Sequence, residues 1–249
     1  MNSSIKKTIA TTLGIFIIFC FWQVLSVIKQ DAFLFPGLIS IFERLIEITT
    51  SSADLSALFT TLYRLFIVIV IAVGIALILA FIYFKFPITL NFFRPIINVL
   101  KAAPFAIISI YIFFAIDKKI APQIVTFLVV LPIAFEGLIA AIDNMDKSIK
   151  DELSLLNIDA FRKYLQIYLP ICFPYIVTTL LQSFGLGLKV MIMSEYMCQI
   201  EGTVGQILIN IKYNYEFDYL LAWLIIIVAI VCIIDLLIRI ISSKLVKNN

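Results

Sequence analysis

Residues 65–84 read LFIVIVIAVGIALILAFIYF and contain no charged side chain. Arg64 precedes this stretch and Lys85 follows it, so both of its ends carry a positive charge. An α-helix needs about 20 mostly apolar residues to cross the hydrocarbon core of a bilayer. The stretch therefore predicts a transmembrane helix.

The composition extends this prediction to the whole chain. Of the 249 residues, 63% are hydrophobic and 14% are charged, whereas a soluble domain has about 45 to 50% apolar and about 25% charged residues. A water-soluble domain is thereby disfavoured. We expect an all-α, polytopic membrane bundle of about six transmembrane helices that forms a single domain over residues 1–249. The other predicted spans are residues 8–28, 95–116, 121–142, 171–196 and 218–241.

Charge and residue types argue against several classes of protein. The net charge of +3 is scattered along the chain, so we expect no nucleic-acid partner. The chain has no histidine, the commonest general base and metal ligand. Acidic residues within the spans are few and lie at different depths. We therefore expect no catalytic residue, no metal site and no cofactor, and a membrane-embedded enzyme is kept only as an alternative.

The distribution of basic residues predicts the orientation in the membrane. Eleven of the 19 Lys and Arg residues lie in loops on the same side as the N-terminus, and six lie on the other side. Because cytoplasmic loops are enriched in Lys and Arg, both termini are expected in the cytoplasm. Residues 37–50 form a shorter amphipathic pattern, which predicts a helix along the outer membrane surface.

The largest polar loop, residues 143–168, is patterned as two short helices. Ile149, Leu153 and Leu156 fall at positions i, i+4 and i+7, which gives one apolar stripe. Asn157 tolerates the left-handed conformation that ends a helix, and Asp159 can cap the next one. Such a structured cytoplasmic hairpin has the form of a docking surface. The alternative is an amphipathic loop that serves topology alone.

Charged residues inside the spans are candidates for function. Asp235 and Arg239 are four residues apart, which predicts an ion pair along one helix. Lys189 and Glu195 lie on different faces of their helix, and Glu136 lies at another depth than Lys189, so we expect none of these three to pair with another. Each then faces a pore, a second copy of the chain or the outer interface, or has a structural neighbour.

Within the loop, the order of residues resembles the cytoplasmic motif of the inner-membrane permease subunits of binding-protein-dependent ABC importers. That motif reads Glu-Ala-Ala, three residues, Gly, and later Ile-x-Leu-Pro. Here Asp151, Glu152 and Leu153 stand in the first place, Asn157 takes the place of Gly, and residues 167–170 read Ile-Tyr-Leu-Pro. Asp for Glu, the missing Ala pair and Asn for Gly are departures from the motif. Asn is the best substitute for Gly in a left-handed turn.

Further segments are similar to the sulfonate, nitrate and taurine branch of this family. They are Phe35-Pro36-Gly37, Thr61-Leu62-Tyr63-Arg64, Arg94-Pro95, Ala103-Pro104, Leu131-Pro132-Ile133, and Lys189 and Glu195 followed by Gly202, Val204 and Gly205. Each segment is short, and it is their common order and spacing that carry the resemblance.

The resemblance implies the type I ABC importer permease fold in the bacterial cytoplasmic membrane. Its implied partners are a cytoplasmic ABC ATPase dimer, an extracytoplasmic substrate-binding protein, a second permease copy and the lipid bilayer. Residues 143–170 would then be the coupling hairpin. Its implied ATPase-coupling residues are Asp151, Glu152, Leu153, Leu156, Asn157, Asp159, Ala160 and Phe161. The implied residues of the translocation pathway or gate are Lys189, Glu195, Glu136 and Pro104.

The need for an ATPase partner also follows from the residues themselves. None of the eight glycines begins a GxxxxGK[ST] phosphate loop, so the chain cannot bind ATP by that motif. A self-contained secondary carrier is the other alternative, although the sequence shows neither two similar halves nor charges at the midplane. The sequence leaves the cargo open among organosulfonates, nitrate, thiamine precursors and riboflavin.

Overall fold

The computed structural model describes residues 3–29, 31, 33–155 and 158–247. Over these residues the chain is helical and contains no strand. Five helical segments are long and apolar enough to cross a membrane, and a bent pair of helices makes a sixth if it counts as one span. The predicted all-α membrane bundle is therefore confirmed. The long helices are α1 (Ser3–Lys29), α3 (Ser52–Lys85), α6 (Ala121–Asp143), α9 (Leu169–Cys198) and α11 (Phe217–Lys247).

The span predicted over residues 95–116, which Lys101 and Pro104 interrupt, is bent in the structure. A 3-10 turn, η1 (Pro87–Thr89), leads into α4 (Leu90–Ala102), which is followed by α5 (Phe105–Ala115) at an angle of 93°. Pro104 causes the break, because proline has no backbone N–H to donate and disfavours helical geometry in the residue before it. Ala103 is accordingly extended, with φ −68° and ψ 128°.

The chain forms two compact units, one of Met1–Leu55 with Ile207–Ala229 and the other of Ser56–Gln206 with Ile230–Asn249. In the first unit, the loop after α1 folds back on that helix, because the Trp22 indole N–H donates to the Pro36 carbonyl over 3.0 Å. Helix α2 (Leu38–Thr50) follows and buries Ile41 and Ile48. The amphipathic helix predicted over residues 37–50 is thus confirmed, and its place on the outer membrane surface stays a prediction.

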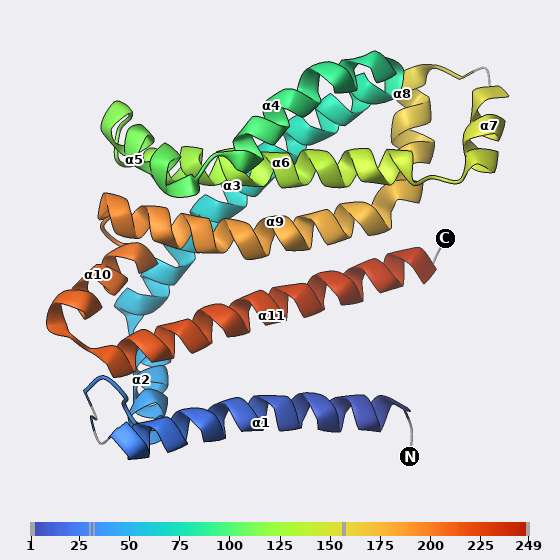
Figure 1. Ribbon diagram of the computed structural model, residues 1–249. Coiled ribbons are helices and arrows are strands. Elements are labelled where there is room, and N and C mark those ends of the chain that lie inside the picture. The colour runs from blue at the N-terminus through green and yellow to red at the C-terminus, as the bar shows by residue number, and fades with distance from the viewer. Residues whose placement is uncertain (1–2, 30, 32, 156–157, 248–249) are drawn as a thin grey trace. The chain divides into compact units, whose positions relative to one another are not determined.

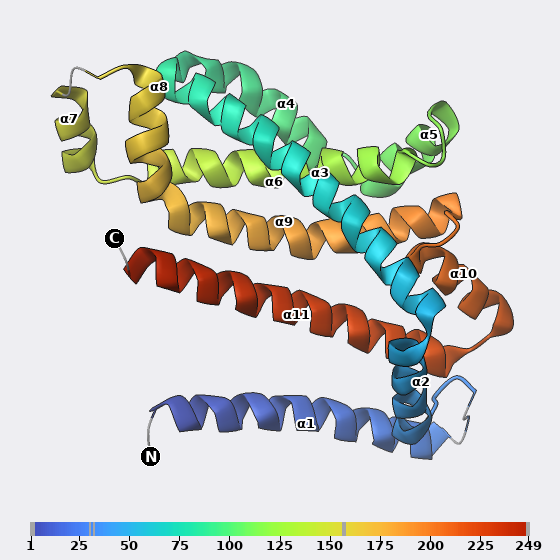
Figure 2. The ribbon, with the colours of Figure 1, turned by 180° about the vertical axis from the view of Figure 1, so that it is seen from behind.

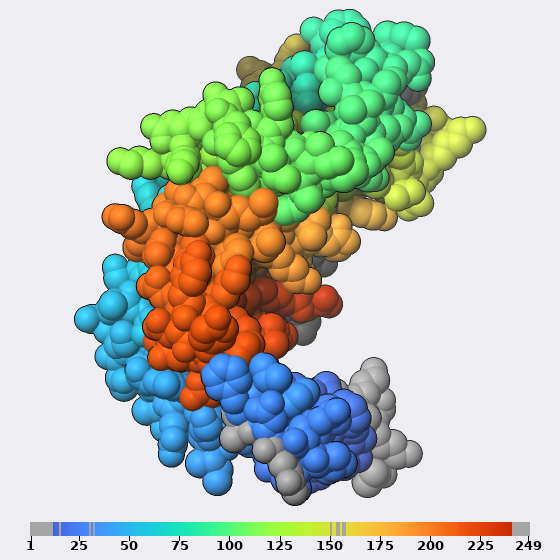
Figure 3. All heavy atoms as spheres, turned by 60° about the vertical axis from the view of Figure 1, so that its left-hand side comes forward, coloured from blue at the N-terminus to red at the C-terminus, as the bar shows by residue number. Residues whose placement is uncertain are grey.

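In the second unit, α6 and α9 lie side by side along most of their lengths, as both ribbon views show (Figures 1 and 2). Two glycines permit this close packing. A Cβ atom on Gly137 would lie 1.9 Å from Thr179 Oγ1 of α9, and one on Gly187 would lie 3.1 Å from Val130 Cγ2 of α6. Helices α4 and α5 form a continuous surface beside the C-terminal part of α9 (Figure 3, green beside orange).

The polar loop folds as predicted into short helical elements. They are α7 (Lys147–Leu155), α8 (Ala160–Lys163) and a π-helical turn, η2 (Tyr164–Tyr168), that leads directly into α9. The cap predicted for Asp159 is confirmed, since its carboxylate accepts a hydrogen bond of 3.0 Å from the Phe161 amide. Leu156 and Asn157 lie outside the described residues. A further helix, α10 (Val204–Asn214), follows α9.

Candidate functional site

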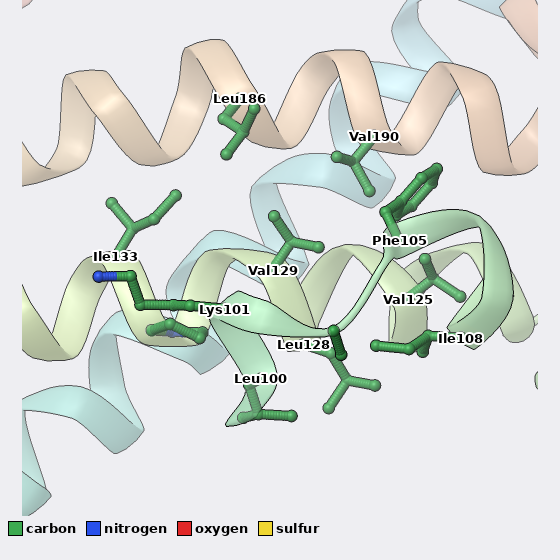
Figure 4. A pocket seen from close by; sticks show the side chains of 12 residues that line it. Leu100, Lys101, Phe105, Ile108, Val125, Leu128, Val129, Ile133, Leu186 and Val190 are labelled. Atoms are coloured by element: carbon green, nitrogen blue, oxygen red, sulfur yellow. The ribbon is translucent and has the colours of Figure 1, made fainter. Parts of the chain in front are cut away.

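The break between α4 and α5 opens a cavity in the second unit. Pro104 caps α5 in an extended conformation, so the chain turns there and leaves space against α6 and α9. The cavity has a volume of about 480 Å³, within the roughly 300 to 1,000 Å³ of small-molecule sites. Figure 4 shows Phe105 and Val129 facing Leu186 and Val190 of α9. The lining residues are Leu100, Lys101, Ala103, Phe105, Ile108, Val125, Leu128, Val129, Pro132, Ile133, Leu186 and Val190.

An ion pair lies beside this apolar cavity. Lys101 Nζ is 2.6 Å from one carboxylate oxygen of Glu136 and 2.8 Å from the other. Both side chains are about half exposed. In Figure 4 the Lys101 side chain extends along the cavity toward Ile133. Since ionisable residues inside spans are costly unless paired, this pair marks the cavity as a candidate site.

A second, polar cavity begins at the same ion pair. It has a volume of about 290 Å³ and is lined by Glu136 together with Arg94, Asp143 and Asn144, besides apolar side chains of α4 and α6. The Tyr83 hydroxyl donates to Asp143 over 2.5 Å, which ties the end of α6 to α3. Glu136 thus lies between an apolar and a polar cavity along α6.

Glu195 lies in a different environment, fully buried between α3, α9 and the start of α10. The Thr61 hydroxyl donates to Glu195 Oε2 over 2.7 Å, and Arg64 Nε lies 3.3 Å from Oε1. Thr61 in turn accepts a hydrogen bond of 3.1 Å from the Val204 amide. A Cβ atom on Gly205 would lie 2.3 Å from the Tyr196 backbone nitrogen, so α10 starts in direct contact with α9. The geometry favours a structural role for Glu195.

Lys189 is exposed on another face of α9, as predicted from its angular separation from Glu195. No hydrogen bond or ion pair of Lys189 occurs among the described residues. The exposed residues around it recur at three- and four-residue intervals and so form one stripe along the helix. This α9 stripe consists of Thr178, Gln182, Leu186, Lys189 and Met193.

The hairpin of α7, α8 and η2 is joined to the end of α3 by aromatic side chains. The Phe161 ring lies 5.6 Å from that of Phe81, and Tyr164 and Tyr168 lie 5.7 Å and 4.2 Å from Phe84. The Tyr164 hydroxyl donates to the Leu77 carbonyl over 3.1 Å. Aromatic pairs at such distances each contribute about 0.5 to 1.5 kcal/mol beyond their buried area. These contacts hold α8 and η2 of the hairpin to the end of α3.

Residues 72–247 match the family described as binding-protein-dependent transport system inner membrane component. The chain belongs to this family. It is accordingly a permease component of an ABC importer, a multi-pass inner-membrane protein of a transport family and not of an enzyme family. The matched residues include the hairpin, both cavities and the α9 stripe. No curated protein matches the chain.

The permease brings together only some of the residues singled out in its sequence. Pro104 and Glu136 both adjoin the α4–α5 cavity, and Lys189 lies on α9 between the lining residues Leu186 and Val190. Glu195 is apart from them in its buried network. In the hairpin, Asp151 and Glu152 are exposed, as is Phe161 in spite of its ring contact. Of the coupling set, the Leu153 side chain and Leu156 and Asn157 lie outside what the structure describes.

Sequence reasoning missed two partners of these residues. Lys101 lies within the predicted span over residues 95–116, and nothing in the sequence indicates its pairing with Glu136. Arg64 precedes the apolar stretch of residues 65–84 as a flanking charge, yet it pairs with Glu195. The sequence does hold one signal for the Arg64–Glu195 pair. Thr61 and Arg64 are three residues apart, so they share one helix face and can contact the same partner.

The ion pair predicted between Asp235 and Arg239 is confirmed at 2.9 Å.

The first unit of the permease carries a polar network and an aromatic group. Arg44 of α2 donates to Asp218 at the start of α11 over 3.0 Å and to Glu47 over 2.7 Å. Hydrogen bonds to Glu47 and Asp218 raise the pKa of the Arg44 guanidinium above its ordinary value. Nearby, the Phe33 ring lies 5.3 Å from Phe217 and 6.1 Å from Tyr215, and Phe33 and Tyr215 are exposed.

Proposed function

We propose that this permease forms the translocation pathway of an importer of the sulfonate, nitrate and taurine type, as a homodimer. In this proposal residues 1–249 act as one permease domain, and residues 143–170 couple it to a cytoplasmic ABC ATPase dimer. An extracytoplasmic substrate-binding protein delivers the cargo. The observation that carries the proposal is the structured hairpin attached to α3 by its aromatic side chains.

The attachment explains how movement of an ATPase reaches the membrane. A flexible loop would absorb a displacement, whereas a hairpin packed on α3 transmits it to a helix long enough to span the bilayer. Phe161 is the link at the exposed end, because its ring contacts Phe81 while 55% of the residue remains accessible. The acidic side chains of Asp151 and Glu152 are exposed on α7, where a partner can reach them.

This assignment implies the orientation of the chain. With the hairpin in the cytoplasm, both termini are cytoplasmic, as the Lys and Arg distribution also favours. The aromatic group of Phe33, Tyr215 and Phe217, of which Phe33 and Tyr215 are exposed, then faces the outside. We assign this group to the docking of the substrate-binding protein, because aromatic side chains are enriched at the centres of protein interfaces.

The proposed pathway follows from exposure. Lys189 lies on the α9 stripe, an accessible helix face that carries both polar and apolar residues, and Pro104 and Glu136 adjoin the neighbouring cavity. Glu195 is buried, so it contributes to a gate by holding α3, α9 and α10 together rather than by touching cargo.

The test uses the permease reconstituted with the ATPase that co-purifies with it. Phe161→Ala removes the ring contact with Phe81, so ATP hydrolysis should continue while ATP-dependent uptake falls. Phe114→Ala is the matched control, because Phe114 is 90% exposed on α5, away from the hairpin. A single cysteine at position 151 should cross-link to the ATPase.

Two results would contradict the proposal. Uptake that persists in vesicles without any ATPase would indicate a secondary carrier. Unchanged coupling in Phe161→Ala, together with no cross-link from position 151, would separate the hairpin from the ATPase.

A further inference from the structure

We infer that the α4–α5 cavity binds the cargo, and that the cargo is a small organic solute with an apolar body and an uncharged or zwitterionic head group. The inference rests on the proposed function of the chain as a translocation pathway, and it adds the chemical class of what passes. Its basis is the contrast between the cavity walls, which Figure 4 shows together with Lys101, and the ion pair that Lys101 forms with Glu136.

The walls favour a solute with an apolar body. Lys101 is the only charged residue among the twelve that line the cavity, and the others are aliphatic, aromatic or proline side chains. Burial of apolar surface there is favourable at roughly 25 cal/mol per Å². An inorganic anion such as nitrate would instead lose its hydration and meet only one side chain that can donate a hydrogen bond, Lys101.

The ion pair favours a head group without net charge. Lys101 Nζ contacts both oxygens of Glu136 at 2.6 and 2.8 Å, so the positive and negative charges lie almost together. An anion attracted by Lys101 would be repelled by Glu136 at nearly the same distance, and a cation would meet the reverse. The ammonium group has a third donor and the carboxylate has further lone pairs. A group with one donor and one acceptor can use both.

The second cavity gives the bound solute a direction. Beyond Glu136 the lining becomes polar, with Arg94, Asp143 and Asn144. A solute with its apolar body against Val129 and its head group at Lys101 would therefore point that head group toward the polar cavity. The ion pair is then both the head-group site and the boundary that the solute crosses.

The experiment measures protection of a cysteine in the cavity. The intact importer, purified with its ATPase, carries Leu128→Cys in a background where the four free cysteines Cys20, Cys172, Cys198 and Cys232 are alanine. The rate of labelling by N-ethylmaleimide is followed with benzamide, benzoate, benzamidine or nitrate present. The first three share one ring and differ in charge. Benzamide should protect at a concentration about tenfold lower than benzoate or benzamidine requires. Nitrate should not protect.

Single substitutions of the ion pair should invert this preference. Glu136→Gln leaves Lys101 unneutralised, so benzoate should become the best protectant. Lys101→Met leaves Glu136 unneutralised, so benzamidine should take that place. Asp235→Asn is the matched control, because it breaks an ion pair of 2.9 Å on α11 that does not line the cavity, and it should keep the benzamide preference.

A variant with the two charges exchanged provides the test if the single variants do not fold. If the single variants do not assemble with the ATPase, Lys101→Glu combined with Glu136→Lys should assemble and favour benzamide again. The inference is overturned if nitrate protects as well as benzamide, or if no ring compound protects. It is also overturned if the single variants, the charge-exchange variant and the protein with the original Lys101–Glu136 pair all rank the probes in the same order. ATP-dependent uptake in the same preparation tests the proposed function separately, since it can persist while protection fails.

Discussion

The buried Glu195 network allows one prediction to be worked through in magnitude. Glu195 has no exposed surface, and the Arg64 side chain is 13% exposed. Removal of one partner from a buried ion pair costs about 3 to 5 kcal/mol, because the other charge is left without compensation. The 3.3 Å separation lacks the geometry of a hydrogen bond, which places this pair near the lower limit. We expect Glu195→Ala to lower the stability of the permease by about 3 kcal/mol.

The assay is thermal unfolding of the purified permease, followed by loss of the monodisperse species. At about 2 to 4 °C per kcal/mol, the midpoint of Glu195→Ala should fall on the order of 10 °C. The midpoint of Glu195→Gln should fall less, since the amide oxygen of the glutamine still accepts a hydrogen bond from Thr61. Glu201→Gln is the matched control, because Glu201 is exposed in the loop that follows α9; its midpoint should not change.

Arg64 provides the decisive comparison. In a double-mutant cycle, Glu195→Met with Arg64→Met should be less destabilised than the two single variants together, because no buried charge then remains uncompensated. Additive effects, or a Glu195→Ala midpoint equal to that of Glu201→Gln, would refute the reasoning. If Glu195→Gln keeps its full stability but loses uptake, Glu195 belongs to the translocation pathway instead.

Three further predictions address the helix packing, the stripe and the hairpin. Gly137→Ala should destabilise the permease by about 1 to 3 kcal/mol in the same unfolding assay, because its Cβ would overlap Thr179 Oγ1; an added Thr179→Ala should restore part of the loss, and a neutral single variant would contradict the packing. Lys189→Met should impair uptake while assembly and basal ATP hydrolysis persist, and Lys189→Arg should retain part of the activity; normal uptake by Lys189→Met would exclude Lys189 from the pathway. Asn157→Gly should preserve transport whereas Asn157→Val should uncouple it, because a β-branched residue resists positive φ; equal uptake by the two variants would remove the left-handed turn from the argument.

The long helices could be predicted because each carries its own evidence in one continuous stretch. The 20 uncharged residues from Leu65 predict the C-terminal part of α3, which begins earlier, at Ser52. The predicted spans at α6 and α9 lie within two residues of the ends of those helices, and the span at α11 ends before its helix does. The bend in the α4–α5 segment could not be predicted, because apolar content does not distinguish a straight helix from a broken one. Pro104 interrupts this segment, but a proline within a span can kink a helix slightly or end it. The extended Ala103 decides between them.

The candidate site could be predicted only in part, for a different reason. Glu136 and Lys189 stand out alone, since a charge among apolar residues is visible without a partner. Their contacts are not visible, because Lys101 and Glu136 are 35 residues apart and meet only after α4 has folded against α6. The same holds for Arg64 and Glu195, which belong to α3 and α9. Sequence patterns report faces of single helices, whereas these pairs depend on how two helices pack.

The two walls of the α4–α5 cavity are held with unequal strength, and this has a consequence for transport. On one wall, α6 and α9 interlock at Gly137 and Thr179, where there is no space even for a methyl group. On the other wall, no residue between Ile97 and Ser109 is buried. Phe105 and Ile108 are partly buried and pack on the core cluster that includes Val125 of α6, and the exposed Lys101–Glu136 pair adds a polar contact. An exposed ion pair contributes only about 0 to 1 kcal/mol. We therefore expect any change in cavity size during transport to come from a movement at the α4–α5 break. That movement would also separate Lys101 from Glu136, the ion pair that contacts the solute in our inference.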